Sequence, residues 1–308
     1  MTEQRHNHIP QEAFDWYDEY AHGLMDRRTF MKKLGGLVAL GYSMAMLSSA
    51  LLPNYALAEQ VSFNDPDIKA SYKTFDSFKG HGEGKGYLVE PANLTGKLPI
   101  VLVIHENRGL NPYIKDVARR LAKAGFIAFA PDALHPLGGY PGNDDEGRAM
   151  QRSMDKQKIQ QDFIAAAEYI KRHPNSNGKL GAVGFCFGGY MVNYLAAVDS
   201  KLIDAGVPYY GTPAVKELRQ NIKAPLLVHL AEFDKRVNAT WPEYESDLKA
   251  HQVPYTMHMY EQANHGFHND STSRYDEKQA ELSWQRTLAF FNEQLIWTEQ
   301  FHTLSKKF

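Results

Sequence analysis

A cysteine, an aspartate and a histidine stand where they could form a nucleophilic triad. Cys186, the only cysteine among 308 residues, lies in the stretch AVGFCFGGY, residues 182–190. The run from Gly184 to Gly188 fits the pattern G-x-nucleophile-x-G, in which a sharp strand-to-helix turn exposes the central side chain at a helix N-terminus. The partial positive charge of that terminus favours a thiolate. A free cysteine is also among the most buried residue types, so this pattern alone leaves a nucleophile and a core filler as equal alternatives.

The candidate partners of the cysteine follow two later apolar runs. Asp234 ends the run PLLVHLAEFD, and His265 lies in EQANHGFHND, after the expected strand 255–260. Asp234 could simply cap a turn, and His265 is one of 13 histidines. The chain order nucleophile, acid, histidine is nevertheless the order of the α/β-hydrolase arrangement, and the three together favour a triad.

The loop VIHENRGL, after the run at 98–104, could complete such a site. In hydrolases of this architecture a backbone N–H of this loop and the one after the nucleophile form the oxyanion hole. Here those amides belong to Asn107 and Phe187. Glu106 could lie near Cys186, and Arg108 could attract an anion; the less favoured alternative is that both belong to a solvated loop.

Two further arginines, Arg148 and Arg152, are candidate substrate-binding residues. They lie in LGGYPGNDDEGRAMQRS, a glycine-rich and acidic segment that could cover the site. We expect no metal: His265 and His268 are spaced three apart, His105 precedes Glu106, and neither pair fits a zinc signature.

Continuous apolar runs supply the elements that would position these residues. They cover 98–106, 126–132, 179–187, 203–211 and 225–234, and helices are expected at 113–124, 150–171, 190–198, 244–251 and 275–295. Unbroken runs are typical of parallel strands covered on both faces. Residues 71–78 and 82–92 suit an antiparallel edge hairpin with Gly82, Gly84 and Gly86 around its turn. The sequence therefore predicts one doubly wound, mostly parallel α/β-hydrolase domain over residues 59–308, with helices on both faces.

Composition is that of a globular protein, with 43% hydrophobic and 23% charged residues. A formal net charge of −2 provides no basic footprint for nucleic acid, so a small-molecule partner is favoured.

Residues 1–58 are expected to be a separate N-terminal segment. Arg27 and Arg28 precede a Gly/Ala/Leu/Met stretch that runs to about Leu52, and Ala56-Leu57-Ala58 resembles a signal-peptidase site. This pattern predicts export by the twin-arginine machinery, cleavage near Ala58, and a periplasmic or otherwise exported protein. The alternative is an uncleaved anchor over residues 34–52.

From about Gly84 to Asn292 the chain resembles the dienelactone hydrolase family. The resemblance rests on HENRGL, GFCFGG, Phe233-Asp234 and NHGF at 264–267. It implies a triad of Cys186, His265 and Asp234, with Glu106 matching a glutamate that contacts the resting cysteine. It also implies hydrolysis of lactones or simple esters without metal or organic cofactor. The sequence has Asn269 where the best-known members have a substrate-binding arginine, and those members are typically cytosolic.

The expected reaction is acyl transfer through a thioester on Cys186, with the Asn107 and Phe187 amides stabilising the oxyanion. Two other classes remain open. A non-catalytic exported binding or stress protein could use the same fold. A thiol redox protein is disfavoured because no second cysteine is present to resolve a disulfide.

Overall fold

The computed structural model describes residues 9–51, 53–55 and 58–296, and its centre is an eight-stranded sheet. The strand order is β1-β2-β4-β3-β5-β6-β7-β8. Strand β2 is antiparallel to both β1 and β4, and every other neighbouring pair is parallel. The expected doubly wound, mostly parallel sheet with an antiparallel edge hairpin is confirmed.

The strands are β1 (Ile68–Ser77), β2 (Gly82–Pro91), β3 (Leu98–Ile104), β4 (Ile127–Pro131), β5 (Ser176–Phe185), β6 (Ala205–Tyr209), β7 (Leu226–Ala231) and β8 (Tyr255–Tyr260). The α-helices are α1 (Gln11–Ala21), α2 (Arg27–Ala39), α3 (Met44–Leu51), α4 (Pro112–Lys123), α5 (Asp144–Ser153), α6 (Lys156–Lys171), α7 (Phe187–Val198), α8 (Lys235–Asn238), α9 (Trp241–Ala250) and α10 (Glu277–Leu295). Two short 3₁₀ helices are η1 (His135–Leu137) and η2 (Lys216–Asn221).

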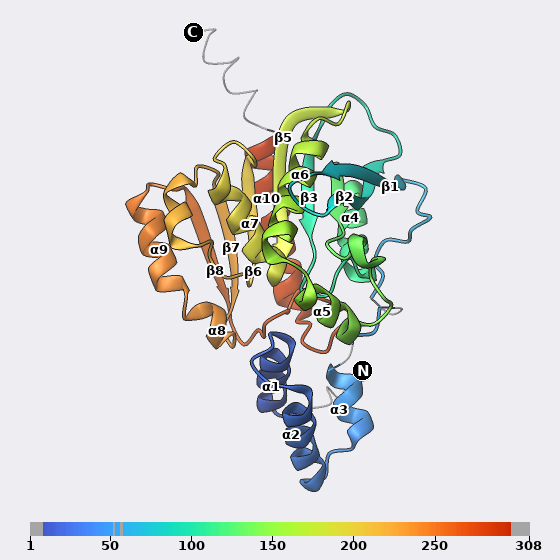
Figure 1. Ribbon diagram of the computed structural model, residues 1–308, viewed down its shortest axis with the longest axis vertical. Coiled ribbons are helices and arrows are strands. Elements are labelled where there is room, and N and C mark those ends of the chain that lie inside the picture. The colour runs from blue at the N-terminus through green and yellow to red at the C-terminus, as the bar shows by residue number, and fades with distance from the viewer. Residues whose placement is uncertain (1–8, 52, 56–57, 297–308) are drawn as a thin grey trace.

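Helices cover both faces of the sheet, as the unbroken apolar strands require (Figure 1). Helices α6, α7 and α9 bury their apolar sides in one core layer, which includes Phe163, Met191 and Leu248. Helices α4 and α10 form the other layer, with Val117 and Phe291 among its members. The parallel strands consequently end at one common edge, where the loops after β3, β5, β7 and β8 meet.

The expected helix 150–171 is in fact two helices. Helix α5 begins earlier, at Asp144, and ends at Ser153; Met154 then has ψ of 156°, an extended conformation. Asp155 caps α6 through its side chain, which accepts hydrogen bonds from the backbone N–H groups of Gln157 and Lys158. An aspartate in this role stabilises the start of a new helix. The apolar periodicity runs through both helices, so it did not indicate the boundary between them.

The expected turn glycines of the edge hairpin also differ from their prediction. Gly82 begins β2, whereas Gly84 and Gly86 lie within the strand. A Cβ at either position would overlap the ring of Phe75 or Phe129. These two glycines therefore make room for aromatic packing and do not shape the turn.

The three N-terminal helices lie together below the edge at which the parallel strands end (Figure 1). They share a small apolar cluster that includes Tyr17, Phe30, Leu34 and Leu47. No helix among the described residues is both long and apolar enough to span a bilayer. Ala56 and Leu57, which belong to the expected cleavage motif, lie outside the described residues, and Ala58 is buried.

Candidate active site

Cys186 occupies a strained turn between β5 and α7. Its φ of 58° and ψ of −111° place a non-glycine residue in a rarely populated region. The flanking glycines permit this turn: a Cβ on Gly184 would overlap the backbone of Gly188, and one on Gly188 would overlap the backbone of Ile104. The thiol therefore lies at the N-terminus of α7, as the pattern G-x-nucleophile-x-G predicts.

His265 and Asp234 meet beside this turn. The Nδ1 atom of His265 lies 2.5 Å from Oδ2 of Asp234, and both residues are buried. Asp234 also caps α8 by accepting a hydrogen bond from the N–H of Val237. The Nε2 atom of His265 has no hydrogen-bond partner among the described residues, and a ring nitrogen of His265 lies within 4.8 Å of the Cys186 sulfur. The three residues expected to form a triad are thus brought together.

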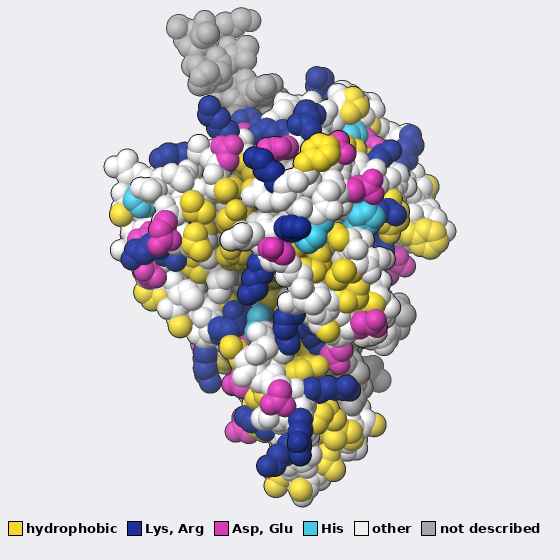
Figure 2. All heavy atoms as spheres, viewed as in Figure 1, with side chains coloured by type: hydrophobic (Ala, Val, Ile, Leu, Met, Phe, Trp, Pro, Cys, Tyr) yellow, Lys and Arg dark blue, Asp and Glu magenta, His cyan; other side chains and the backbone are white. Residues whose placement is uncertain are grey.

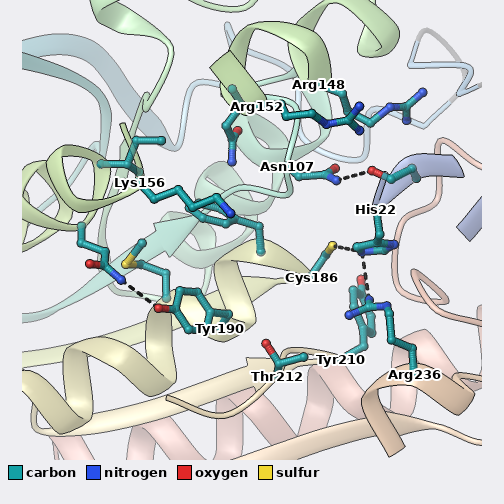
Figure 3. Close-up of a pocket in the computed structure, with 16 residues that line it drawn as sticks. His22, Asn107, Arg148, Arg152, Lys156, Cys186, Tyr190, Tyr210, Thr212 and Arg236 are labelled. Atoms are coloured by element: carbon teal, nitrogen blue, oxygen red, sulfur yellow. Dashed lines mark hydrogen bonds between the residues drawn. The ribbon is translucent and has the colours of Figure 1, made fainter. Parts of the chain in front are cut away.

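A cavity of about 460 Å³ opens beside the thiol (Figure 3). Asn107, Cys186 and Phe187 all line it. Asn107 follows β3 and Phe187 is the first residue of α7, so the two residues with the expected oxyanion amides stand next to the nucleophile. The volume suits a small-molecule ligand.

The N-terminal helices contribute a second histidine, which the sequence analysis did not identify. His22 follows the last residue of α1, and its Nε2 lies 3.2 Å from the Cys186 sulfur (Figure 3). Its Nδ1 lies 2.8 Å from the backbone oxygen of Asp18 and 3.2 Å from the Asp18 carboxylate. The Arg236 guanidinium approaches the same Nε2, at 2.9 Å.

Asp18 is the common counter-ion of the cluster. Besides His22, its carboxylate lies 3.6 Å from Nε of Arg236 and 3.9 Å from Nε2 of His265. Burial by itself would raise the pKa of Asp18, yet His265, His22 and Arg236 together hold this pKa below its usual range. The carboxylate is therefore ionised.

The same charges set the protonation of the thiol. Burial opposes ionisation of Cys186, but His22 and His265 bring its pKa well below the ordinary value. Burial likewise opposes protonation of the histidines. The Cys186 thiolate and Asp18 raise the pKa of His22 to about 9, and Asp18, Asp234 and Cys186 raise that of His265 to about 10. The site consequently favours a thiolate beside imidazolium, the reactive form of a nucleophilic cysteine.

Glu106 and Arg108 lie under the site. One Glu106 carboxylate oxygen accepts a hydrogen bond from Asn269 at 3.0 Å and lies 3.4 Å from Nε of Arg108. Arg108 also pairs with Asp144, and only 3% of its side chain is exposed. Arg108 is therefore not among the residues that line the cavity, whereas Arg148 and Arg152 are. Asn269, at the position where the family resemblance leads one to expect an arginine, holds Glu106 instead.

Cations surround the cavity. Arg148, Arg152, Lys156 and Arg236 line it together with His22, and no aspartate or glutamate of the described chain does. Arg148 is buried, donates a hydrogen bond to the Tyr17 hydroxyl and pairs with Asp145. Figure 2 shows Lys and Arg side chains gathered around the hollow between the N-terminal helices and the sheet domain. Such a rim attracts anions.

The same cluster contains groups that could ligate a metal ion. His22, Cys186 and His265 bring one ligand atom each within 4.8 Å of one another, and so do Asp18, Asp234 and His265. The Arg236 guanidinium, however, lies against the nitrogen of His22 that would bind the ion, and a fixed cation at that place disfavours a second one. His268, which the sequence analysis considered with His265, instead contacts the Tyr113 hydroxyl through its Nδ1.

Comparison with known proteins identifies the family. Residues 85–295 match the family model for the dienelactone hydrolase family, which spans more than half of the chain. The chain belongs to the dienelactone hydrolase family. Membership makes it a carboxylic ester hydrolase with the α/β-hydrolase fold, as the sequence predicted. Residues 1–38 match a separate model, described as YqhI-like.

Individual relatives of this dienelactone hydrolase family member agree with the assignment. Carboxymethylenebutenolidase of Pseudomonas putida is 29% identical over 226 residues, which are 70% of this chain and 94% of the relative. The fragment YghX of Escherichia coli (strain K12) is 64% identical over 109 residues, 35% of this chain and 93% of the fragment. A Klebsiella pneumoniae crystal structure named for dienelactone hydrolase is 26% identical, with a TM-score of 0.64, and the match covers 73% of this chain and 99% of that one.

Sequence reasoning missed three members of the site: Asp18, His22 and Arg236. The first two lie in residues 1–58, the segment expected to be separate from the hydrolase domain. A usable signal was present there, because Ala13, Tyr17 and Ala21 recur every four residues and predict one apolar face of a helix. Arg236 had no comparable signal, since a charged residue two positions after Asp234 fits any exposed turn.

Proposed function

We propose that the protein hydrolyses a small anionic ester or lactone through a thioester on Cys186, with His265 and Asp234 as the other members of a triad. The observation that carries this proposal is the Cys186 thiol on a strained turn, beside a histidine whose far nitrogen contacts a buried carboxylate at 2.5 Å. Asp234 orients the imidazole and stabilises its charged form, which is the role of the acid in such triads.

The chemistry proceeds in two steps. The Cys186 thiolate attacks the ester carbonyl, the Asn107 and Phe187 amides stabilise the oxyanion, and the alkoxide leaves with a proton from an imidazolium. Water, deprotonated by His265, then attacks the thioester, and the thiolate and a carboxylic acid are released. A thiolate is expelled more readily than an alkoxide, so this nucleophile suits enol lactones and aryl esters with activated leaving groups.

The cationic rim supports an anionic substrate. Arg152 and Lys156 are exposed, line the cavity, and form no ion pair with any part of the chain that the structure describes. Their charges are free to meet a carboxylate, whereas Arg148 already pairs with Asp145. Among the three candidate substrate-binding arginines, we therefore assign the anion contact to Arg152, with Lys156 beside it.

The experiment that tests the proposal is mass spectrometry of the full-length protein mixed with an activated aryl ester and quenched within the first turnovers. An acyl increment on the peptide that contains Cys186, absent from Cys186→Ala, is the expected result. No adduct and no released phenol, under conditions where iodoacetamide labels Cys186, would refute the triad proposal and favour a binding protein on a hydrolase scaffold.

Export by the twin-arginine machinery remains a prediction from the sequence. Arg27 and Arg28 begin α2 and are exposed, and Asp26 caps this helix by accepting a hydrogen bond from the N–H of Thr29. Replacing both arginines by lysine is expected to leave the protein in the cytoplasm. Unchanged export of that variant, measured by fractionation, would contradict the prediction.

A further inference from the structure

We propose that His22, supplied by the N-terminal helical segment, is a catalytic residue that accepts the proton of the Cys186 thiol, so that residues 9–51 form part of the active enzyme. This inference rests on the proposed function, because it assigns a second histidine to the same nucleophile. It also conflicts with cleavage near Ala58, which would remove both His22 and Asp18.

The orientation of His22 is fixed from its other nitrogen. Nδ1 lies 2.8 Å from the backbone oxygen of Asp18, and a carbonyl oxygen can only accept, so Nδ1 carries a hydrogen. Nε2 is then the nitrogen that exchanges a proton with the sulfur, 3.2 Å away. The Arg236 guanidinium can only donate, so its contact with Nε2 belongs to the unprotonated His22 and is given up once Nε2 has taken the thiol proton.

Two helix ends of opposite polarity meet at this pair. Cys186 precedes the first residue of α7, where the N-terminal partial positive charge stabilises a thiolate. His22 follows the last residue of α1, where the C-terminal partial negative charge stabilises an imidazolium. The Asp18 carboxylate lies beside the resulting cation and balances both it and Arg236.

Helix α1 is held in this position along its length. Gln11 donates a hydrogen bond to the side chain of Asn264, and Asn107 donates one to the backbone oxygen of Ala21 at 2.8 Å. Asp15 and Asp18 face Lys235 and Arg236 of α8 at 3.5 Å and 3.6 Å. Acidic residues of α1 thus meet basic residues of the hydrolase domain, and this charge complementarity indicates a specific interface between the two.

The segment forms a wall of the cavity without filling it. Ala21 and His22 line the cavity of about 460 Å³ together with Cys186, Asn107 and Phe187. The cavity therefore remains open beside Cys186, Asn107 and Phe187 while His22 is in contact with the sulfur. This geometry favours a histidine that takes part in the reaction over a plug that blocks it.

The proton balance assigns one task to each histidine. The Sγ–H proton passes to Nε2 of His22, and the thiolate attacks the carbonyl. The C–O bond then breaks, and the departing alkoxide takes that proton from His22. Acylation removes the sulfur charge that helps to keep His265 protonated, so His265 is neutral in the second step and removes a proton from the attacking water. The C–S bond then breaks, the thiolate and the carboxylic acid are released, and the proton passes from His265 to the sulfur.

The test compares His22→Ala and the bulkier His22→Gln with His251→Ala, an exposed histidine at the end of α9, all in the full-length chain. The first readout is the pH profile of Cys186 alkylation by iodoacetamide, in which every label is unambiguous because the chain has one cysteine. Both His22 variants are expected to shift the midpoint of the profile upward by at least one pH unit. Asp18→Asn, which removes a positioning carboxylate, is expected to shift it less in the same direction, and His251→Ala not at all.

The second readout is the rate of the acylation burst with an activated aryl ester, which is expected to fall at least tenfold in both His22 variants. An unchanged alkylation profile with an unchanged burst would overturn the proposal and leave His22 a passive wall. A faster burst in His22→Ala would overturn it in favour of an autoinhibitory segment. Absence of any acyl enzyme in the unmodified protein would refute the proposed function instead, while the alkylation profile would still decide whether His22 accepts the thiol proton.

Discussion

Nε2 of His22 lies 3.2 Å from Sγ of Cys186, although 164 positions separate the two residues in the chain. The contact joins the end of an N-terminal helix to the nucleophile turn of an α/β-hydrolase domain. Cys186 therefore has a histidine and a carboxylate on each of two sides: His22 with Asp18, and His265 with Asp234. This arrangement determines where the proton of the thiol can go, and the predictions below follow from it and from the cations around the cavity.

The Asp234→Asn variant tests the orienting role of the acid. The N–H of Val237 donates to one side-chain oxygen of Asp234, so in the variant it holds the amide oxygen and the NH₂ group faces Nδ1 of His265. This favours the tautomer with its hydrogen on Nε2, and the catalytic rate is expected to fall by about 10³ to 10⁴-fold. The measurement is kcat/KM for an aryl ester. An Asp247→Asn variant, at a partly exposed ion pair with Arg219, serves as the matched control and is expected to keep the rate. A loss of less than about threefold in Asp234→Asn would remove Asp234 from the proposed triad.

The pH profiles of two reactions should report on the thiolate and the imidazolium separately: alkylation of Cys186 depends on the thiolate, and hydrolysis of an alkyl ester depends also on the imidazolium. Because the pKa of Cys186 is lowered, the thiolate persists below the ordinary thiol pKa of about 8.5, and alkylation of Cys186 should stay fast at pH values below that ordinary pKa. Hydrolysis of an alkyl ester needs an imidazolium to protonate the leaving group. Since the pKa values of His22 and His265 are raised to about 9 and about 10, this hydrolysis should decline only as the pH rises above 9.

Parallel profiles for alkylation and alkyl-ester hydrolysis above pH 9 would contradict this separation. An alkylation rate that falls about tenfold per pH unit below pH 8 would show instead that Cys186 has an ordinary thiol pKa.

Arg152 and Lys156 should select for anionic substrates. The double variant Arg152→Ala, Lys156→Ala is expected to raise KM for an ester with a carboxylate by about tenfold, since each exposed charge contributes up to ~1 kcal/mol. A neutral ester of the same leaving group should show no such change. The double variant Lys223→Ala, Lys249→Ala, at two exposed lysines that do not line the cavity, controls for the same change in net charge. Equal effects on the two esters would contradict an anion contact.

Arg108 is expected to matter for stability more than for substrate binding. Its removal leaves the buried carboxylates of Glu106 and Asp144 without the cation that both of them pair with. Breaking a buried ion pair in this way costs about 3 to 5 kcal/mol. Arg108→Met should lower the free energy of unfolding by that amount in urea, and the folded fraction should bind the anionic ester with unchanged KM. A raised KM without loss of stability would return Arg108 to the substrate site.

The convergence of Cys186, Asp234 and His265 could be predicted because these residues follow apolar runs whose order is visible in the sequence. Parallel strands end at one edge of a sheet, so residues placed directly after β5, β7 and β8 must converge there. The two glycines around Cys186 added a local constraint, since only residues without a Cβ allow the close backbone approach of this turn. The boundary between α5 and α6 was missed because the helical periodicity continues through Met154, and only the Asp155 cap marks the break.

The sequence by itself determined the doubly wound sheet, the nucleophile turn and the convergence of Cys186, Asp234 and His265, because each depends on local periodicity or on strand ends. Only the tertiary structure decided that His22 reaches the sulfur, that Arg108 pairs with carboxylates below the cavity, and that Asn269 holds Glu106. Those contacts join segments far apart in the chain, and they depend on how helix ends and buried charges pack against one another. Local residue patterns do not indicate which distant segments pair. The N-terminal segment could therefore be recognised as part of the site only from the way that α1 packs against the hydrolase domain.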